Sequence, residues 1–190
     1  MVAQDERIGA TVIRIDLKGR GLVAVDGDEE RASFAPVGRL GASSPAEALA
    51  EPLGGPVRVV VEVQRRFGGL APRALLGGVF TPGLDTDTVF EVGFNRWGEG
   101  PAAVCPSRLW KRPFVAGLPE EFAPAVLDGL TDGGPGLPGG VLRVDRAGAD
   151  EVESSSAVFR QAAAVLRCAL AGMLSAEDVE ARVRDLMQAW

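Results

Sequence analysis

The chain contains no histidine and no tyrosine among its 190 residues. Without histidine there is no Ser-His-Asp or Cys-His nucleophile activation, no imidazole acid–base catalysis and almost no ordinary zinc chemistry. Without tyrosine a further proton donor is missing. An enzyme would have to work with Asp, Glu, Lys, Cys or Ser alone, and we therefore expect a protein that is not an enzyme.

Cysteine is scarce, and long apolar runs are absent. Cys105 and Cys168 are far apart and form no CxxC, which provides neither a disulfide framework nor a zinc ligand set. No apolar run approaches the ~20 residues that span a bilayer, and the charged start MVAQDERIGATV does not resemble a secretory signal. No GxxxxGK[ST] is present, which excludes a P-loop nucleotide site. We expect a cytoplasmic protein without cofactor, metal, nucleotide or membrane contact.

Only the middle of this acidic chain has a positive balance of charge. The net charge is −6, yet residues 58–112 contain 8 basic and 5 acidic side chains. A solvated face of arginines on strands and loops is one interpretation, and a phosphate-binding surface is the other. The candidate contacts for RNA or a ribosome are Arg65, Arg66, Arg73, Arg96, Arg108, Lys111 and Arg112.

The N-terminal third alternates apolar and polar residues in short runs. Strands are predicted near 13–15, 22–25 and 32–34, with KGRG and DGDE as the turns between them. This pattern predicts a small antiparallel β meander over residues 1–40. Residues 41–56, rich in Gly, Pro, Ala and Ser, are predicted as a linker with one short helical turn that starts at Ser44 or Pro45.

Further strands are predicted over 57–67, 88–97 and 141–148, because β-branched residues alternate there with polar ones. Between the first two, the spacing of Gly and Pro predicts a loop with a short strand at 75–80. Residues 117–136 contain the start and stop signals of a helix, with Pro119 in the first turn and an end at Gly129 or at 133–134. Its buried stripe would be Phe122, Val126 and Leu130.

The segment DEVESSSAVFRQAAAVLRCAL, which begins at Asp150, allows three interpretations. Its serines could be catalytic, its acids could surround a divalent cation, or the segment could be a helix start. No histidine is present to activate a serine, and apolar residues recur at helical spacing for about 16 residues. We therefore predict an N-cap at Ser154, Ser155 or Ser156. The cation alternative would use Asp145, Asp150, Glu151 and Glu153, and the predicted stripe is Val158, Phe159, Ala162, Val165, Leu166, Ala169 and Leu170.

The last sixteen residues, SAEDVEARVRDLMQAW, predict a second capped amphipathic helix over 175–190. Ser175 is the predicted N-cap. The predicted stripe is Val179, Val183, Leu186, Met187 and Trp190.

Two blocks of sequence resemble the fourth domain of elongation factor G and of the tetracycline-resistance ribosomal protection proteins. The first block contains Phe114, Gly117, Pro119, Glu121, Phe122, Ala125, Val126, Gly129 and Leu130. The second block contains Glu151, Val152, Ser154, Ser155, Phe159 and Ala162. The chain departs from the family pattern at four places. It has one residue fewer between Gly117 and Pro119, Glu153 replaces an Asp, Val158 replaces an Ala, and Asp150 stands where the family often has a histidine.

The resemblance implies an α+β fold, a split β-α-β sandwich with a four-stranded sheet and two helices on one face. It covers 114–170 firmly and about 57–172 loosely. The expected order is the β meander, the linker, this domain over 57–174 and the helix 175–190. In the full factors the domain has no catalytic residues and reaches into the ribosomal decoding site. The nearest counterpart of the family's basic tip loop is RRFGGLAPR, residues 65–73.

Two functions follow from these expectations. The first is a non-catalytic, translation-factor-like accessory protein that contacts the ribosome or RNA through its arginines. The alternative is a protein–protein interaction module that kept the fold and lost RNA contact. In that case Trp97, Trp110, Trp190 and the terminal helix would supply apolar anchors for a partner or for self-association.

Overall fold

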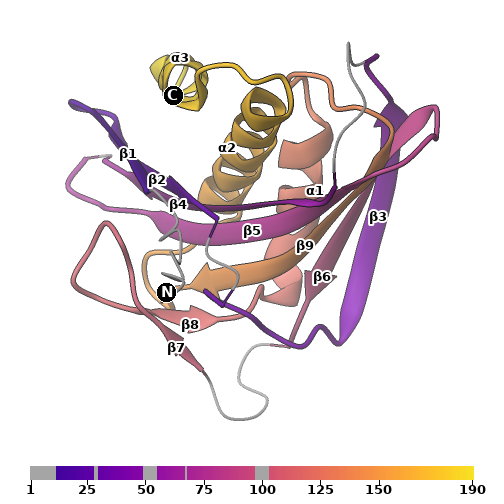
Figure 1. Cartoon of the computed structure of the whole chain (residues 1–190). Helices are drawn as coiled ribbons and strands as arrows, with labels where there is room; N and C mark the ends of the chain where they lie inside the picture. Colours follow the sequence, from indigo (N-terminus) through magenta and orange to yellow (C-terminus); the bar gives the residue numbers. More distant parts are fainter. Residues whose placement is uncertain (1–11, 28–29, 49–54, 67, 97–102) are drawn as a thin grey trace, which may run out of the picture.

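The computed structural model describes residues 12–27, 30–48, 55–66, 68–96 and 103–190 as one large mixed sheet with three α-helices (Figure 1). The sheet is mostly antiparallel, with the strand order β1-β2-β4-β5-β9-β6-β3. These strands are β1 Ile13–Leu17, β2 Gly21–Asp26, β3 Gly38–Pro45, β4 Val57–Arg65, β5 Arg73–Pro82, β6 Asp87–Phe94 and β9 Gly140–Ala149. A short pair, β7 Val104–Cys105 and β8 Phe114–Ala116, joins the sheet through β9. The helices are η1 Glu120–Phe122, a 3₁₀ turn, then α1 Ala123–Thr131, α2 Ser156–Leu174 and α3 Val179–Gln188. The predicted α+β class is confirmed.

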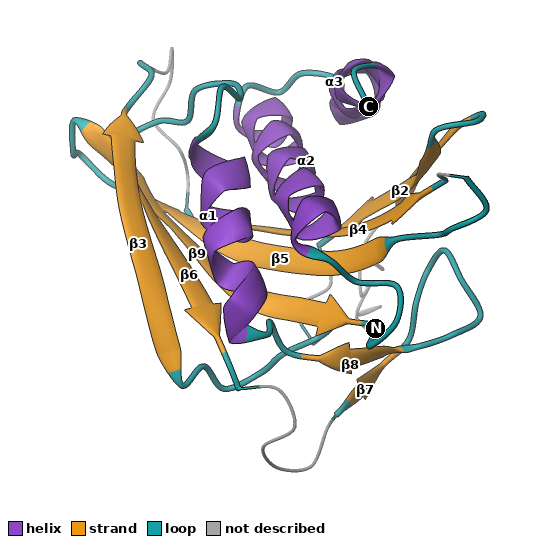
Figure 2. Ribbon diagram, turned by 180° about the vertical axis from the view of Figure 1, so that it is seen from behind, coloured by secondary structure: helices purple, strands orange, loops and turns teal. Residues whose placement is uncertain are grey.

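All three α-helices cover the same face of the sheet, as Figure 2 shows from the side opposite to Figure 1. The helix α2 packs on β4 and β5, α1 packs on β3 and β6, and α3 packs on α2 and β1. The centre of the sheet is valine-rich: Val59, Val61 and Val63 of β4 are buried in the core shared with the helices. The intervening Val60 and Glu62 are also buried, but on the second face. Both faces of β4 are thus covered.

The two central helices contact each other very closely. Gly129 of α1 lies against the backbone of Arg160 in α2, where an added Cβ would overlap the carbonyl oxygen. Phe122 stacks on Phe159 with ring centroids 5.2 Å apart. Gly129 is therefore an interior packing residue, and the helix continues to Thr131. The prediction that it could end at Gly129 is wrong, whereas the buried positions Val126 and Leu130 are confirmed.

The long helix α2 begins where the serines predicted it. Ser155 is its N-cap, and its hydroxyl accepts a hydrogen bond of 3.4 Å from the backbone N–H of Val158. The helix has 19 residues, and all seven positions of its predicted stripe are buried. By length and composition alone α2 could span a bilayer, contrary to the sequence expectation, but 67% of its most apolar window is buried inside the protein. Burial of this kind is typical of a core helix.

The terminal helix starts later than predicted. Asp178, not Ser175, is the N-cap of α3, and its side chain accepts from the N–H of Ala181 at 3.2 Å. Ser175 instead ends α2, and its hydroxyl donates to the carbonyl of Ala171 at 2.8 Å. The next residue, Ala176, has φ +54°, which separates the two helices. Of the predicted stripe, Val179, Val183 and Met187 are buried, and Leu186 and Trp190 pack against the core.

The N-terminal region differs from its prediction in two ways. The pair β1–β2 forms as expected, but the third strand of the meander does not, because Ser33 makes an isolated bridge to Arg146 of β9. Residues 41–45, predicted as linker, belong to β3, which pairs with β6 along its whole length. No helical turn starts at Ser44 or Pro45. The strands of the first 45 residues thus lie at both edges of the sheet, and the rest of the predicted linker extends partly beyond the described residues.

The segment predicted as a loop with a short strand is the ten-residue strand β5. Its glycines have low intrinsic strand propensity, but β4 and β9 offer hydrogen-bonding edges on both sides. Side chains at Gly77 and Gly78 would meet Val60 and the backbone of Arg143 at less than 3 Å. Glycine here permits close packing on both faces of the sheet.

Candidate nucleic-acid interface

A buried ion network on the second face of the sheet fixes the loop between β7 and β8. The Arg31 guanidinium donates to Asp26 Oδ2 at 2.8 Å and to the carboxylate of Glu62. The same carboxylate accepts from the hydroxyl of Ser107 and from the N–H of Arg108 at 2.7 Å. Because the side chains of this triad are at least 96% buried, the loop is held by charge-assisted hydrogen bonds in a dry environment.

Arg73 is a structural residue, which corrects its assignment as an RNA contact. It is 1% exposed, and its guanidinium donates to Asp150 Oδ2 at 2.5 Å and to the carbonyls of Arg112 at 2.6 Å and Pro113 at 2.8 Å. Its Cζ lies 4.3 Å from the centre of the Phe114 ring. These contacts join the start of β5, the loop before β8 and the turn before α2.

Asp150, where the family often has a histidine, is the partner that holds Arg73. Burial by itself would raise the pKa of Asp150. Hydrogen bonds from Arg73 and from the N–H groups of Val152 and Glu153 outweigh that effect, and the pKa lies below its ordinary value of 3.8. The carboxylate is therefore ionised at neutral pH and is committed to the fold.

Arg65 and Arg66 meet a second pair of basic residues that the sequence analysis did not connect with them. Arg65 is the last residue of β4 and Arg66 follows it, and the N–H of Arg66 donates to the carbonyl of Arg20 at 3.0 Å. This bond places the β1–β2 turn, with Lys18 and Arg20, beside the β4–β5 turn. Among the described residues, these four basic side chains form one ion pair, between Arg66 Nη1 and Asp16 Oδ1 at 3.7 Å.

Lys111 and Arg112 belong to the same end of the molecule. Both are exposed, and the carbonyl of Arg112 is bound to Arg73 at the start of β5. Figures 1 and 2 show the β1–β2 turn, the β4–β5 turn and the β7–β8 loop extending from one side of the sheet. We call this surface the basic end, and it consists of Lys18, Arg20, Arg65, Arg66, Lys111 and Arg112.

Large apolar side chains are exposed at the same end. Leu70 in the β4–β5 turn is 62% exposed, Trp110 in the β7–β8 loop is 49% exposed, and Val152 before α2 is 75% exposed. Trp110 is thus available for contact with a partner. Trp190 is instead half-buried under Arg65, and Trp97 lies outside the described residues.

The remaining two candidate arginines lie elsewhere. Arg108 is on the β7–β8 loop, but it turns toward the ion network, with its Nε 3.6 Å from Asp26 Oδ2. Arg96 follows β6 and lines a shallow hollow together with Pro119, Glu120 and Glu121. Acidic neighbours weaken the attraction for phosphate at this second position.

The residues considered for a cation site are engaged by arginines or lie in the turn before α2. Asp145 pairs with Arg58 at 2.8 Å and Arg146 at 3.1 Å. Asp150 is bound by Arg73, whereas Glu151 and Glu153 lie in the turn that follows it. Within the part of the chain that the structure describes, no group of three or more Cys, Asp or Glu side chains is placed to hold a metal ion.

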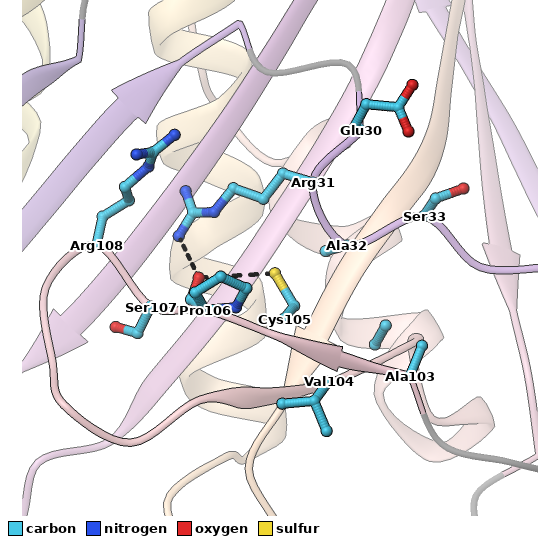
Figure 3. A pocket seen from close by; sticks show the side chains of 11 residues that line it. Glu30, Arg31, Ala32, Ser33, Ala103, Val104, Cys105, Pro106, Ser107 and Arg108 are labelled. Carbon is cyan, nitrogen blue, oxygen red and sulfur yellow. Dashed lines mark hydrogen bonds between the residues drawn. The ribbon is translucent and has the colours of Figure 1, made fainter.

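A hollow of about 490 Å³ lies between residues 30–33 and 103–108 (Figure 3). Both the Arg31 guanidinium and the Cys105 thiol donate to the carbonyl of Pro106, at 3.3 and 3.7 Å. Burial raises the pKa of Cys105, although the nearby Arg31 opposes the shift. The thiol is therefore protonated at neutral pH and is not an activated nucleophile.

Most residues of the family pattern are buried, hydrogen-bonded within the fold or held in a special backbone conformation. Ser154 donates to the carbonyl of Arg73 at 2.7 Å and accepts from the N–H of Asp150 at 2.9 Å. Gly117 has φ +127°, a conformation that favours glycine. Phe114, Pro119 and Phe159 are buried, whereas Glu121 and Glu151 are exposed. Most of the pattern is thus structural.

Comparisons of the chain with protein-family models, with curated proteins and with solved structures give no match.

Proposed function

We propose that the protein is a non-catalytic, cytoplasmic accessory protein of translation that contacts RNA or the ribosome through the basic end. The observation that carries this proposal is the convergence of six basic side chains from three turns on one end of a chain with net charge −6. A local positive surface on an acidic protein attracts polyanions at short range without coating the whole molecule.

We further propose that residues 57–174 form a split β-α-β sandwich of the elongation factor G type. The support comes from β4, β5, β9 and β6, which lie adjacent in that order with α1 and α2 on one face. The strands β6 and β9 are parallel, and α1 lies between them in sequence. The predicted tip loop 65–73 lies at the basic end.

Co-sedimentation of the purified protein with ribosomes, separate subunits and total RNA across a salt series tests the proposal. We expect saturable binding that falls steeply with salt, because about 0.7–0.9 counterions are released for each neutralised phosphate. Replacing both Arg65 and Arg66 with Glu removes binding. The matched control reverses Arg39 and Arg143, two exposed arginines of β3 and β9, and leaves binding within about twofold at equal net charge.

A second candidate function, a protein–protein interaction module, is favoured by the exposed Leu70, Trp110 and Val152. Self-association through α3 is not supported, because Val179, Val183 and Met187 of that helix are buried against α2 and β1. No RNA or ribosome binding at low salt, combined with salt-independent capture of a protein that Trp110→Ala abolishes, would replace the first proposal with this one.

A further inference from the structure

Arg65 is a partly buried arginine, and two donor atoms of its guanidinium have no acceptor. It ends β4 on the helix-covered face, where its Cζ lies 4.6 Å from the centre of the Trp190 ring. Its Nε and Nη1 atoms are buried, and neither has a hydrogen-bond partner. Among the described residues no carboxylate pairs with it, and Arg20 adds a second positive charge nearby.

Three arginines that are more deeply buried than Arg65 provide an internal comparison. Arg31 has two carboxylates, Arg73 has a carboxylate and two carbonyls, and Arg167 has the carbonyls of Pro135 and Leu130 at 2.7 Å each. Arg73 also stacks on an aromatic ring, as Arg65 does. Arg31 Nε also lacks a partner, but both Nη atoms of Arg31 donate to carboxylates, whereas Nε and Nη1 of Arg65 are both without an acceptor.

A cation that is partly desolvated and unpaired is unfavourable, and the cost is recovered when an anion fills its donors. Burial and the nearby charge of Arg20 lower the pKa of Arg65, because both make its charged form less favourable. The contact with Trp190 restricts the orientation of the planar guanidinium. Its unpartnered Nε–H and the adjacent Nη2–H lie on one edge and form a pair of parallel donors. Such a fork matches two oxygens of one phosphate.

We propose that Arg65, supported by Trp190 and assisted by Arg20, binds a phosphate group of RNA as a fixed, bidentate contact. The inference rests on the proposed function for the identity of its ligand. It differs from the general attraction of the basic end because it requires the geometry of a guanidinium and not only its charge. Lys18, Arg66, Lys111 and Arg112 contribute charge to the same surface but no comparable fixed fork.

The test measures binding of inorganic pyrophosphate by thermal shift and of a fluorescent single-stranded oligoribonucleotide by anisotropy, both on the full chain at low salt. Arg65→Lys keeps the positive charge and loses the guanidinium fork, and we expect it to lower the affinity for both ligands about five- to tenfold. Arg65→Gln, which also removes the charge, lowers the affinity for both ligands more than Arg65→Lys does. Arg39→Gln, the matched charge control on β3, changes binding less than about twofold. Circular dichroism confirms that each variant is folded.

The outcomes separate this inference from the proposed function. If Arg65→Lys binds as the wild type does, or if Arg65→Gln and Arg39→Gln weaken binding equally, only net charge matters and the fixed site is refuted, although RNA binding stands. If pyrophosphate binds in an Arg65-dependent way and no RNA binds, the phosphate site stands with a free phosphate compound as its ligand, and the RNA function falls. If the wild type binds neither ligand, both are refuted.

Discussion

Removing the Asp150 carboxylate should destabilise the whole fold, because Arg73 would then be a buried cation without its counter-charge. The two side chains are 8% and 2% exposed, and their closest nitrogen–oxygen distance is 2.5 Å. Asp150 Oδ1 also accepts from the N–H of Val152 at 2.9 Å and of Glu153 at 3.1 Å, which shapes the turn before α2.

Breaking a buried pair by deleting one partner costs about 3–5 kcal/mol, and we expect Asp150→Ala to lose that much of its free energy of unfolding. Asp150→Asn keeps an acceptor for the turn and should lose less. The double variant Asp150→Ala/Arg73→Met should be more stable than Asp150→Ala alone, because it removes the unpaired cation. Asp132→Ala, which breaks the exposed pair with Arg160, is the control and should change stability by about 0–1 kcal/mol.

Urea unfolding followed by circular dichroism measures these differences, and repeating it at several pH values tests their electrostatic origin. The pKa of Asp150 is lowered in the folded protein, so its stabilising effect is complete above the ordinary value of 3.8 and is lost as the pH falls through the lower, folded-state value. The gap between wild type and Asp150→Ala should narrow in that range. A loss below about 1 kcal/mol at pH 7, or a gap that does not depend on pH, would refute the reasoning.

Two further predictions concern packing and thiol chemistry. Gly129→Ala should lower the free energy of unfolding in urea by about 1–3 kcal/mol. The added Cβ would overlap the Arg160 carbonyl oxygen and approach Ala163 Cβ to 2.8 Å. The control Gly55→Ala should be neutral, because no atom lies within 4 Å of its added Cβ. An unchanged midpoint for Gly129→Ala would mean that α1 and α2 are farther apart than described. In the native state at pH 8, neither Cys105 nor Cys168 should react with Ellman's reagent, because both thiols are buried and burial raises their pKa values above the ordinary 9.0. In urea, both thiols should react. Rapid labelling of the native protein would contradict their burial.

Local sequence patterns correctly predicted those helices and strands in which the apolar residues that form the pattern are also the residues buried in the core. The three- and four-residue spacing in 158–170 predicted the buried face of α2, and the serines before it predicted its N-cap. The alternating valines of 57–65 predicted β4. In each case the residues that favour the element locally are also those that the core buries.

The glycine-rich strand β5 and the edge strand β3 could not be predicted in the same way. Neither Gly77 nor Ser43 favours a strand by itself. Both form ladders because a neighbouring strand offers unpaired N–H and C=O groups, and that neighbour is distant in sequence: β9 for Gly77 and β6 for Ser43.

The sequence by itself determined the two main amphipathic helices and the positive charge balance in the middle of the chain, since these follow from composition and spacing. Only the tertiary structure decided which arginines are paired with carboxylates inside the fold. Arg73 and Arg65 are eight residues apart in one basic segment, yet Arg73 is neutralised by Asp150. Arg65 instead lies against Trp190 near Arg20 and pairs with no acid in the part of the chain that the structure describes. Burial and pairing depend on contacts between distant segments, so a count of charges along the chain could not separate them.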